Sequence, residues 1–251
     1  MKYIVALVAL FLASCTHKPE ESVRKSVVFI HGSHFDSGAW SQVLPELQDL
    51  YDTHTITLMG RDEVEHASLT EMAKDACEQV QTPSVMVGHS FGGAVINQMM
   101  GICPEKVQGI VYVTALVPLK GEKPFDAMGK ADQAAYEKAV TFKKDRIVPK
   151  ATATFLKAMD ADVIVKPLPD VRLYSESYIG GADPIIYEDA AFAQVPKYYI
   201  YATHDQIVQM TSQKKYTDRT KMRKTESVES GHLPMLSKPK ELAGALKKVI
   251  N

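Results

Sequence analysis

The sequence lacks an excess of charge of either sign. Its 251 residues include 29 Lys and Arg against 30 Asp and Glu, which gives a formal net charge of −1. Without a basic surface field, nucleic acid is not an expected partner. A glycine-rich phosphate loop and internal repeats are also missing. With 45% hydrophobic residues, the chain has the composition of a globular protein, and the expected partner is a small molecule.

A hydrophobic run long enough to span a membrane is absent as well. The apolar stretch from Tyr3 to Ala13 is shorter than the roughly 20 residues that a spanning helix needs. It fits the apolar region of a secretory signal, and residues 12–15, LASC, resemble the bacterial lipobox. We therefore predict a lipoprotein signal peptide over residues 1–15, acylation of Cys15 and a tether over residues 16–25. The alternatives are a cleaved soluble signal and an uncleaved anchor.

Such an anchor places the protein in a bacterial cell envelope, at the periplasmic face of the outer membrane. Cysteine is scarce, with only Cys77 and Cys103 besides Cys15. An oxidising compartment permits a disulfide between them. Two buried free thiols are the expectation, with the disulfide as the alternative.

Strand-like and helix-like patterns alternate from residue 26 onward, which predicts an α/β fold with a mostly parallel sheet and helices on both of its faces. A helix is expected over 37–50, a second over 68–80 that begins with a Ser/Thr cap and Glu71 in its first turn, and a third over 89–101. Six strands are expected, over 26–30, 53–59, 84–88, 107–115, 197–203 and 223–229. Between Val117 and Val195 the alternation stops, and we predict a helical cap without a strand pair, inserted into a domain that spans 26–251.

The most specific motif is VGHSFGGA, residues 87–94, a G-x-S-x-G sequence between a strand-like and a helix-like run. In that context the motif predicts a nucleophile elbow, a tight turn that exposes the hydroxyl of Ser90 at a helix N-terminus. The alternative is a glycine-rich turn without chemistry. His89 is expected to be a packing residue.

A serine hydroxyl needs a base within hydrogen-bond reach, and after such an elbow an acid and then a histidine follow along the chain. His232, in the loop after the last strand, is the expected base, although it also fits a structural loop residue. Asp205, after the preceding strand, is the expected acid or alternatively a helix N-cap. His204 beside it is expected at the surface.

The backbone N–H groups of Phe91 and Ser33 are the expected oxyanion hole, because they follow the nucleophile and an early buried strand. His31, His34 and Asp36 lie in the same early loop, but their H-x-x-H-x-D spacing fits no zinc pattern. No metal and no cofactor is therefore expected.

These segments, from FIHGSHFDSGAW through VMVGHSFGGAVI and YATHDQI to SGHLPMLSKPKELA, together resemble the α/β-hydrolase superfamily. Within it they resemble the group of plant methyl-ester esterases and hydroxynitrile lyases. The resemblance implies an α/β-hydrolase fold. It covers residues 27–249 apart from the cap, and the loop after His31 is about two residues longer than in the group.

Two pocket positions separate esterase from lyase in this resemblance. The lyases carry Thr where this chain has Gly32, and Lys where it has Leu233. The lysine stabilises departing cyanide, so leucine disfavours the lyase. The sequence thus predicts a serine hydrolase that cleaves small apolar carboxylic esters through an acyl-enzyme. A thioesterase or carbon–carbon bond hydrolase with the same triad, and a ligand receptor of this fold, remain open.

Overall fold

A computed structural model describes residues 24–62, 66–163 and 171–251. The predicted signal peptide, Cys15 and nearly all of the predicted tether lie outside these residues. In the part of the chain that is described, no helix is both long enough and apolar enough to cross a membrane.

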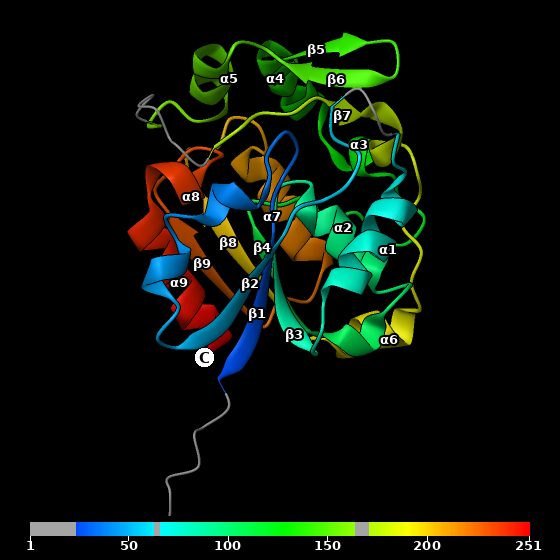
Figure 1. Cartoon of the computed structure of the whole chain (residues 1–251), viewed down its shortest axis with the longest axis vertical. Helices are drawn as coiled ribbons and strands as arrows, with labels where there is room; N and C mark the ends of the chain where they lie inside the picture. Colours follow the sequence, from blue (N-terminus) through cyan, green and yellow to red (C-terminus); the bar gives the residue numbers. More distant parts are fainter. Residues whose placement is uncertain (1–23, 63–65, 164–170) are drawn as a thin grey trace, which may run out of the picture.

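A six-stranded parallel sheet forms the centre of the molecule (Figure 1). Its order is β2-β1-β3-β4-β8-β9, and every neighbouring pair is parallel. The strands are β1 (Lys25–Ile30), β2 (Tyr51–Ile56), β3 (Ser84–His89), β4 (Val107–Val113), β8 (Lys197–Ala202) and β9 (Lys224–Val228). The predicted six strands and the α/β-hydrolase fold class are confirmed.

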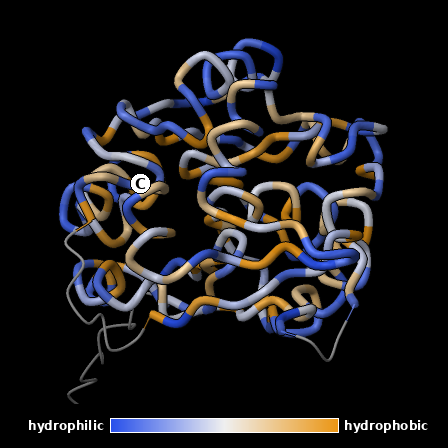
Figure 2. Tube along the Cα trace, turned by 90° about the horizontal axis from the view of Figure 1, so that it is seen from above, coloured by the Kyte–Doolittle hydropathy of each residue, from blue (hydrophilic) through white to orange (hydrophobic). Residues whose placement is uncertain are grey.

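Helices cover both faces of this sheet. Helix α9 (Pro239–Ile250) lies on one face, and α1 (Leu69–Gln79) and α2 (Gly92–Met99) lie on the other (Figure 1). The short α8 (Pro234–Ser237) precedes α9, and α7 (Met210–Arg219) packs on β8. Seen from above, hydrophobic segments run through the middle of the molecule (Figure 2). β3 is the most enclosed strand, with all six of its residues buried, as expected for a central parallel strand.

Local sequence signals explain where these elements begin and end. Ser68 caps α1 as predicted: its Oγ accepts a hydrogen bond from the Glu71 N–H, and the Glu71 carboxylate accepts one from the Ser68 N–H. The single helix expected over 37–50 is wrong. Two 3-10 helices, Ser37–Trp40 and Leu44–Glu46, stand there instead, because Pro45 has no N–H to continue a helical ladder.

The predicted cap, residues 117–195, lies largely over the carboxyl ends of the strands (Figure 1). Its helices are α3 (Pro124–Ala127), α4 (Lys130–Ala139), α5 (Thr152–Met159), the 3-10 helix Tyr178–Gly181 and α6 (Asp189–Gln194). Helix α6 lies at the opposite end of the sheet, because the chain must return there to start β8 in parallel with its neighbours (Figure 1).

The expectation of a cap without a strand pair is wrong. Strands β5 (Val140–Lys143), β6 (Arg146–Pro149) and β7 (Glu176–Ser177) form an antiparallel sheet in the order β5-β6-β7. Helix α4 ends at Ala139, and β5 begins with the β-branched residues Val140 and Thr141. Lys144, with φ 45°, closes the turn between β5 and β6.

The expectation of two free thiols is also wrong, because Cys77 and Cys103 form a disulfide. Cys77 lies in α1 and Cys103 follows α2, and these two helices pack against each other. The Lys106 ammonium donates to the Cys77 carbonyl at 2.8 Å and to the Val80 carbonyl at 3.0 Å, which holds the same two segments together.

A buried carboxylate at the end of α5 joins the cap to the loop before α8. Asp160, 2% exposed, accepts hydrogen bonds from the Leu233 N–H at 3.2 Å and the Ser237 hydroxyl at 2.8 Å. The neighbouring Met159 carbonyl accepts from the His232 N–H at 3.1 Å. The cap is therefore bonded to the segment that carries His232.

Replacing both Cys77 and Cys103 by Ser is expected to lower the free energy of unfolding by about 3 kcal/mol, because the disulfide closes a loop with a sequence separation of 26 residues. Urea denaturation of the oxidised protein and the double variant measures this loss. Dithiothreitol should destabilise the wild type to the same extent and leave the variant unchanged. Equal stability of the two oxidised proteins would contradict the expectation.

Asp160→Ala is expected to lower the free energy of unfolding by about 3 kcal/mol, since two buried donors lose a charged acceptor. Asp162→Ala is the matched control: this aspartate lies two residues further on and is exposed, so its removal should change stability by less than about 0.5 kcal/mol. The comparison is made by urea denaturation, and equal losses in both variants would refute a special role of Asp160.

Candidate active site

The site is organised around the turn between β3 and α2. Ser90 occupies this turn in the left-handed backbone region, with φ 51°. A side chain at Gly92 would place its Cβ 2.7 Å from the Ile30 carbonyl oxygen and 2.8 Å from that of His31, so only glycine allows the turn to lie this close to the end of β1. The predicted tight turn at a helix N-terminus is therefore present.

A chain of hydrogen bonds joins three of the predicted residues. Ser90 Oγ lies 2.9 Å from His232 Nε2, and His232 Nδ1 lies 2.7 Å from Asp205 Oδ2. Asp205 follows β8 and His232 follows β9, so the parallel topology delivers all three side chains to one edge of the sheet. The carboxylate fixes the proton on Nδ1, which leaves Nε2 free to accept the hydrogen bond of the Ser90 hydroxyl.

The carboxylate of Asp205 is held from three further directions. Its Oδ1 accepts the backbone N–H groups of Ile207 at 2.7 Å and Val208 at 3.0 Å, and its Oδ2 accepts the hydroxyl of Thr114. Helix α7 begins only at Met210, so the alternative reading of Asp205 as its N-cap is wrong. Thr114 lies directly after β4, with φ 38°. The sequence did not predict its contact with Asp205, because no local motif indicates it.

The other two histidines near these residues lie as expected from the sequence. His89 is buried, and its Nε2–H donates to the His232 carbonyl at 2.7 Å. Burial lowers the pKa of His89 well below its ordinary value, so its ring is neutral and acts as a support for the His232 loop. His204 is exposed.

A cavity of about 30 Å³ lies beside Ser90. Its wall is mostly apolar, and the cap contributes four of its residues. The residues that line it are Ser33, Phe35, His89, Ser90, Phe91, Leu116, Phe125, Met128, Tyr136, Met159, Ile207, Val208 and His232. The cavity therefore suits an uncharged group of a few atoms.

A larger cavity of about 360 Å³ adjoins the first and shares Phe125, Met128 and Tyr136 with it. Phe142, 47% exposed, and Tyr178, 44% exposed, lie on its rim. Phe155, another aromatic residue of the cap, lines neither cavity, because it is fully buried against Phe35 and His34.

Both predicted oxyanion residues, Ser33 and Phe91, line the cavity beside Ser90. Phe91 is the N-cap residue of α2, and Ser33 lies in the loop of residues 31–36, called the oxyanion loop below. Within the described residues, no cluster of three His, Cys, Asp or Glu side chains is placed to hold a metal ion.

Neither Gly32 nor Leu233, the two predicted pocket positions, lines the cavity; their sequence neighbours Ser33 and His232 do. A Cβ at position 32 would stand 2.8 Å from the Ser90 Cβ and 2.6 Å from His89 Nδ1. Glycine here lets the oxyanion loop pass against Ser90. Leu233 is fully buried.

His34 ties the oxyanion loop to the cap. Its N–H donates to Glu176 Oε1 at 2.7 Å, its Nδ1 lies 2.9 Å from the Tyr174 carbonyl, and its Nε2 lies within hydrogen-bond distance of the Tyr136 hydroxyl. Burial lowers the pKa of His34, so the neutral ring donates from Nδ1 and accepts at Nε2. Burial also raises the pKa of Tyr136 well above its ordinary value, and Ser33 hydrogen-bonds to the same hydroxyl.

The sequence and the fold of this chain are similar to those of known proteins. Residues 27–245 match the Alpha/beta hydrolase family. Methylesterase 8 of Arabidopsis thaliana is 22% identical over 267 residues, covering 96% of this chain and 94% of its own. A pyrethroid hydrolase from Sphingobium faniae superposes with a TM-score of 0.77 at 20% identity, covering 89% of this chain and 96% of that structure.

Polyneuridine aldehyde esterase superposes with a TM-score of 0.75 at 18% identity, covering 91% of this chain and all of that structure. At these identities, the similarity to the two solved structures shows only the fold. The match of residues 27–245 to the family shows the family. The chain belongs to the alpha/beta hydrolase family.

Proposed function

We propose that the chain is a carboxylic ester hydrolase with Ser90 as nucleophile, His232 as general base and Asp205 as the acid that orients it. The observation that carries this proposal is the hydrogen-bond chain from Ser90 Oγ through His232 to Asp205, with distances of 2.9 and 2.7 Å. The similarity to Methylesterase 8 and to further plant methylesterases supports the ester bond as the target.

The reaction begins when Ser90 Oγ attacks the ester carbonyl and His232 Nε2 takes its proton. The carbonyl oxygen becomes an oxyanion held by the N–H groups of Ser33 and Phe91, while Asp205 stabilises the imidazolium. The imidazolium then protonates the leaving alcohol, which leaves an acyl-enzyme on Ser90. A water molecule, deprotonated by His232, releases the acid. No cofactor takes part in these steps.

Small apolar esters are the proposed substrates. Apart from the reacting groups, the polar atoms on the wall of the inner cavity belong to Ser33, His89 and Tyr136, and no Lys, Arg, Asp or Glu lines it. A charged acyl group would lose its hydration there without gaining a partner. Because the inner cavity holds only about 30 Å³, the larger part of an ester fits the adjoining cavity of about 360 Å³. That cavity is lined by Phe125, Phe142 and Tyr178 but also by Asp126 and Glu137, whose carboxylates disfavour an anionic substrate there.

Other reactions use the same three residues. A thioesterase and a carbon–carbon bond hydrolase need no change in the triad, and a panel of matched esters, thioesters and 1,3-diketones separates them. A receptor-like role predicts binding without turnover. A hydroxynitrile lyase is disfavoured, because the chain carries Leu233 where the lyases that it resembles carry lysine.

The proposed location is the cell envelope, with Cys15 acylated and the domain tethered to the membrane. The disulfide between Cys77 and Cys103 supports this proposal, because structural disulfides persist in oxidising compartments. The short apolar run before Cys15 supports export as well.

Ser90→Ala and His232→Ala are each expected to lower kcat by about 10⁴-fold or more, since the nucleophile or its base is gone. His204→Ala is the matched control, because this exposed histidine adjoins Asp205 and should leave kcat unchanged. Hydrolysis of p-nitrophenyl acetate and butyrate gives the rates, and labelling by a fluorophosphonate reports the nucleophile. Full activity in Ser90→Ala would refute the mechanism.

Cys15→Ser is expected to move the protein from the membrane fraction to the soluble fraction of a bacterial host, because the acyl anchor has lost its attachment atom. Fractionation followed by immunoblotting measures the shift, and metabolic labelling with an alkyne fatty acid reports acylation. A variant with Ser14→Ala serves as the control, since it keeps the cysteine. Membrane retention of Cys15→Ser without label would contradict the anchor.

A further inference from the structure

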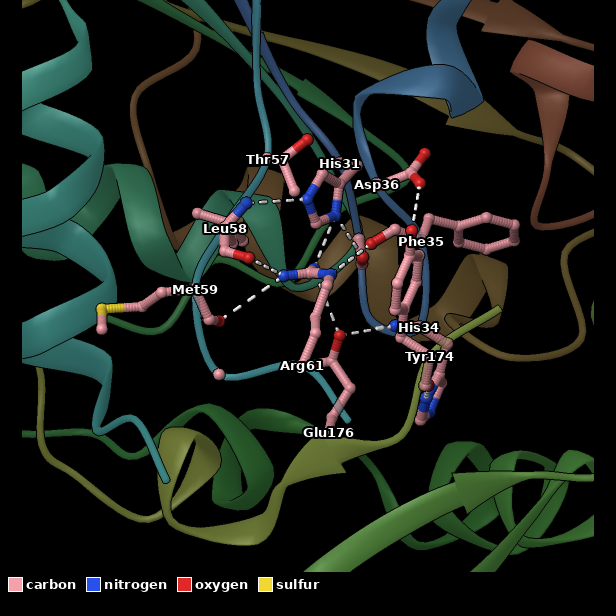
Figure 3. A network of polar contacts seen from close by, with 12 residues as sticks. His31, His34, Phe35, Asp36, Thr57, Leu58, Met59, Arg61, Tyr174 and Glu176 are labelled. Carbon is pink, nitrogen blue, oxygen red and sulfur yellow. Dashed lines mark hydrogen bonds and ion pairs between the residues drawn. The ribbon is translucent and has the colours of Figure 1, made fainter. Parts of the chain in front are cut away.

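A buried guanidinium connects three segments: the oxyanion loop, the loop between β2 and α1, and cap strand β7 (Figure 3). Arg61, in the loop between β2 and α1, donates from Nε to the Phe35 carbonyl at 2.6 Å and from Nη1 to the Leu58 carbonyl. Its Nη2 donates to Glu176 Oε1, in cap strand β7, at 3.2 Å. The side chains of Arg61 and Glu176 are only 9% and 8% exposed.

Glu176 holds the oxyanion loop through the same oxygen. Its Oε1 also accepts the N–H of His34 at 2.7 Å, and the backbones of Arg61 and Glu176 form an antiparallel bridge. His34 has φ 70°, a conformation that a residue with a side chain keeps only when its surroundings fix it. The carboxylate from the cap and the guanidinium from the core therefore fix the middle and the end of this loop.

The start of the loop is fixed by the ring of His31. The Leu58 N–H donates to His31 Nε2 at 3.0 Å, so the proton of the neutral ring is on Nδ1 and is donated to the Gly32 carbonyl at 2.7 Å. Arg61 Nη2 lies 3.1 Å from the same Nδ1, so the guanidinium also packs against this ring. Burial, and secondarily the charge of Arg61, lower the pKa of His31 well below its ordinary value and keep the ring neutral.

The hydrogen bond to the Gly32 carbonyl determines where the next amide points. In a trans peptide the C=O and N–H groups point in opposite directions, and the structure contains no cis peptide among the described residues. With the Gly32 oxygen drawn toward His31, the N–H of Ser33 is directed away from that ring. Arg61 donates hydrogen bonds to the carbonyl of Leu58, the residue whose N–H holds the His31 ring. It also donates to the Phe35 carbonyl, near the other end of the oxyanion loop.

We propose that Arg61 and Glu176 are positioning residues, which hold the oxyanion loop against the cap so that the Ser33 N–H meets the oxyanion formed on Ser90. This inference rests on the proposed function. It gives the cap a role in the reaction, because Glu176 of β7 accepts the hydrogen bonds of both Arg61 and His34.

The proposed effect falls on the transition state and not on substrate binding. Neither Arg61 nor Glu176 lines the cavity beside Ser90, so the apolar contacts of a bound ester do not involve them. An oxyanion donor, in contrast, stabilises only the charge that develops during reaction, and loses its effect when displaced by a fraction of an ångström. A disturbed loop should therefore lower kcat and leave KM nearly unchanged.

Two variants and one matched control test the proposal. Arg61→Lys keeps the charge but loses the planar fork that reaches three oxygens at once. Glu176→Gln keeps an acceptor oxygen for His34 but removes the charge that faces Arg61. Arg172→Gln is the control, because the Arg172–Asp62 ion pair joins the same two segments, with side chains 70% and 45% exposed.

The full-length proteins are compared on p-nitrophenyl butyrate, with active sites counted by fluorophosphonate labelling. Arg61→Lys and Glu176→Gln should each lower kcat by about 10- to 100-fold with KM changed less than about threefold, and Arg172→Gln should match the wild type. If Arg61→Lys does not fold, Glu176→Gln alone decides the matter. Thermal unfolding of each variant shows how much stability is lost.

A trifluoromethyl ketone separates a positioning role from a structural one. Ser90 Oγ adds to its carbonyl carbon, the serine proton passes to His232, and the carbonyl electrons remain as an oxyanion in the proposed hole. Its Ki should rise in proportion to the loss of kcat, while the Ki of the matched secondary alcohol, which forms no oxyanion, stays constant.

A lower melting temperature with unchanged kcat per labelled serine and unchanged ketone affinity would overturn the inference and leave the esterase proposal intact. A wild-type protein that neither labels nor hydrolyses esters would instead refute the proposed function, and the inference with it.

Discussion

The left-handed backbone of Ser90 is the constraint on which the rest of the site depends. It turns the chain from β3 into α2 within two residues, Ser90 and Phe91, and Gly92 then lies so close to the end of β1 that a Cβ would stand 2.7 Å from the Ile30 carbonyl oxygen. Gly32 repeats the constraint on the other side, where a Cβ would stand 2.8 Å from that of Ser90. Close backbone packing thus places Ser90 and the oxyanion loop next to each other, without a contribution from side-chain hydrogen bonds.

Strand topology supplies the remaining groups to the same place. β8 and β9 run parallel to β3 and β4, so the loops that follow them end at the same edge of the sheet, where Asp205 and His232 meet Ser90. Thr114, immediately after β4, completes the set by donating its hydroxyl to Asp205. This is the usual location of ligand sites in open parallel sheets, and it explains why residues far apart in sequence converge.

Much of this arrangement was predictable because its signals are local. Buried parallel strands read as continuous apolar runs, the glycines around Ser90 reflect a tight turn, and Ser68 with Glu71 forms a capping box within four residues. The six strands and their alternation with helices follow from such patterns.

The parts that were not predictable depend on contacts between distant segments. Cys77 and Cys103 pair because α1 packs on α2, and the hairpin of β5 and β6 forms where a helical pattern runs into β-branched residues. Arg61 and Glu176 are 115 positions apart, and nothing near either residue indicates its partner. Asp160 likewise finds the Leu233 N–H across 73 positions.

The cap is bonded to the core by buried polar groups, and this distinguishes it from a loosely attached lid. Asp160 reaches the loop that carries His232, and Glu176 reaches the oxyanion loop through His34 and Arg61. Detaching the cap would break these buried, charge-assisted hydrogen bonds, so it is unfavourable. Met159 and Tyr136 complete the cavity wall from the same cap.

The lining of the cavity beside Ser90 limits the chemistry proposed for it. No lysine or arginine lines this cavity, and Leu233, which follows His232, is fully buried. An anionic leaving group would therefore meet no cation there, and it can depart only after it receives a proton. In the proposed reaction the proton donor in reach is His232, whose Nε2 lies 2.9 Å from Ser90 Oγ and whose Nδ1 lies 2.7 Å from Asp205 Oδ2. The proposed departure of an alcohol after protonation fits this lining, and departure of a free anion does not.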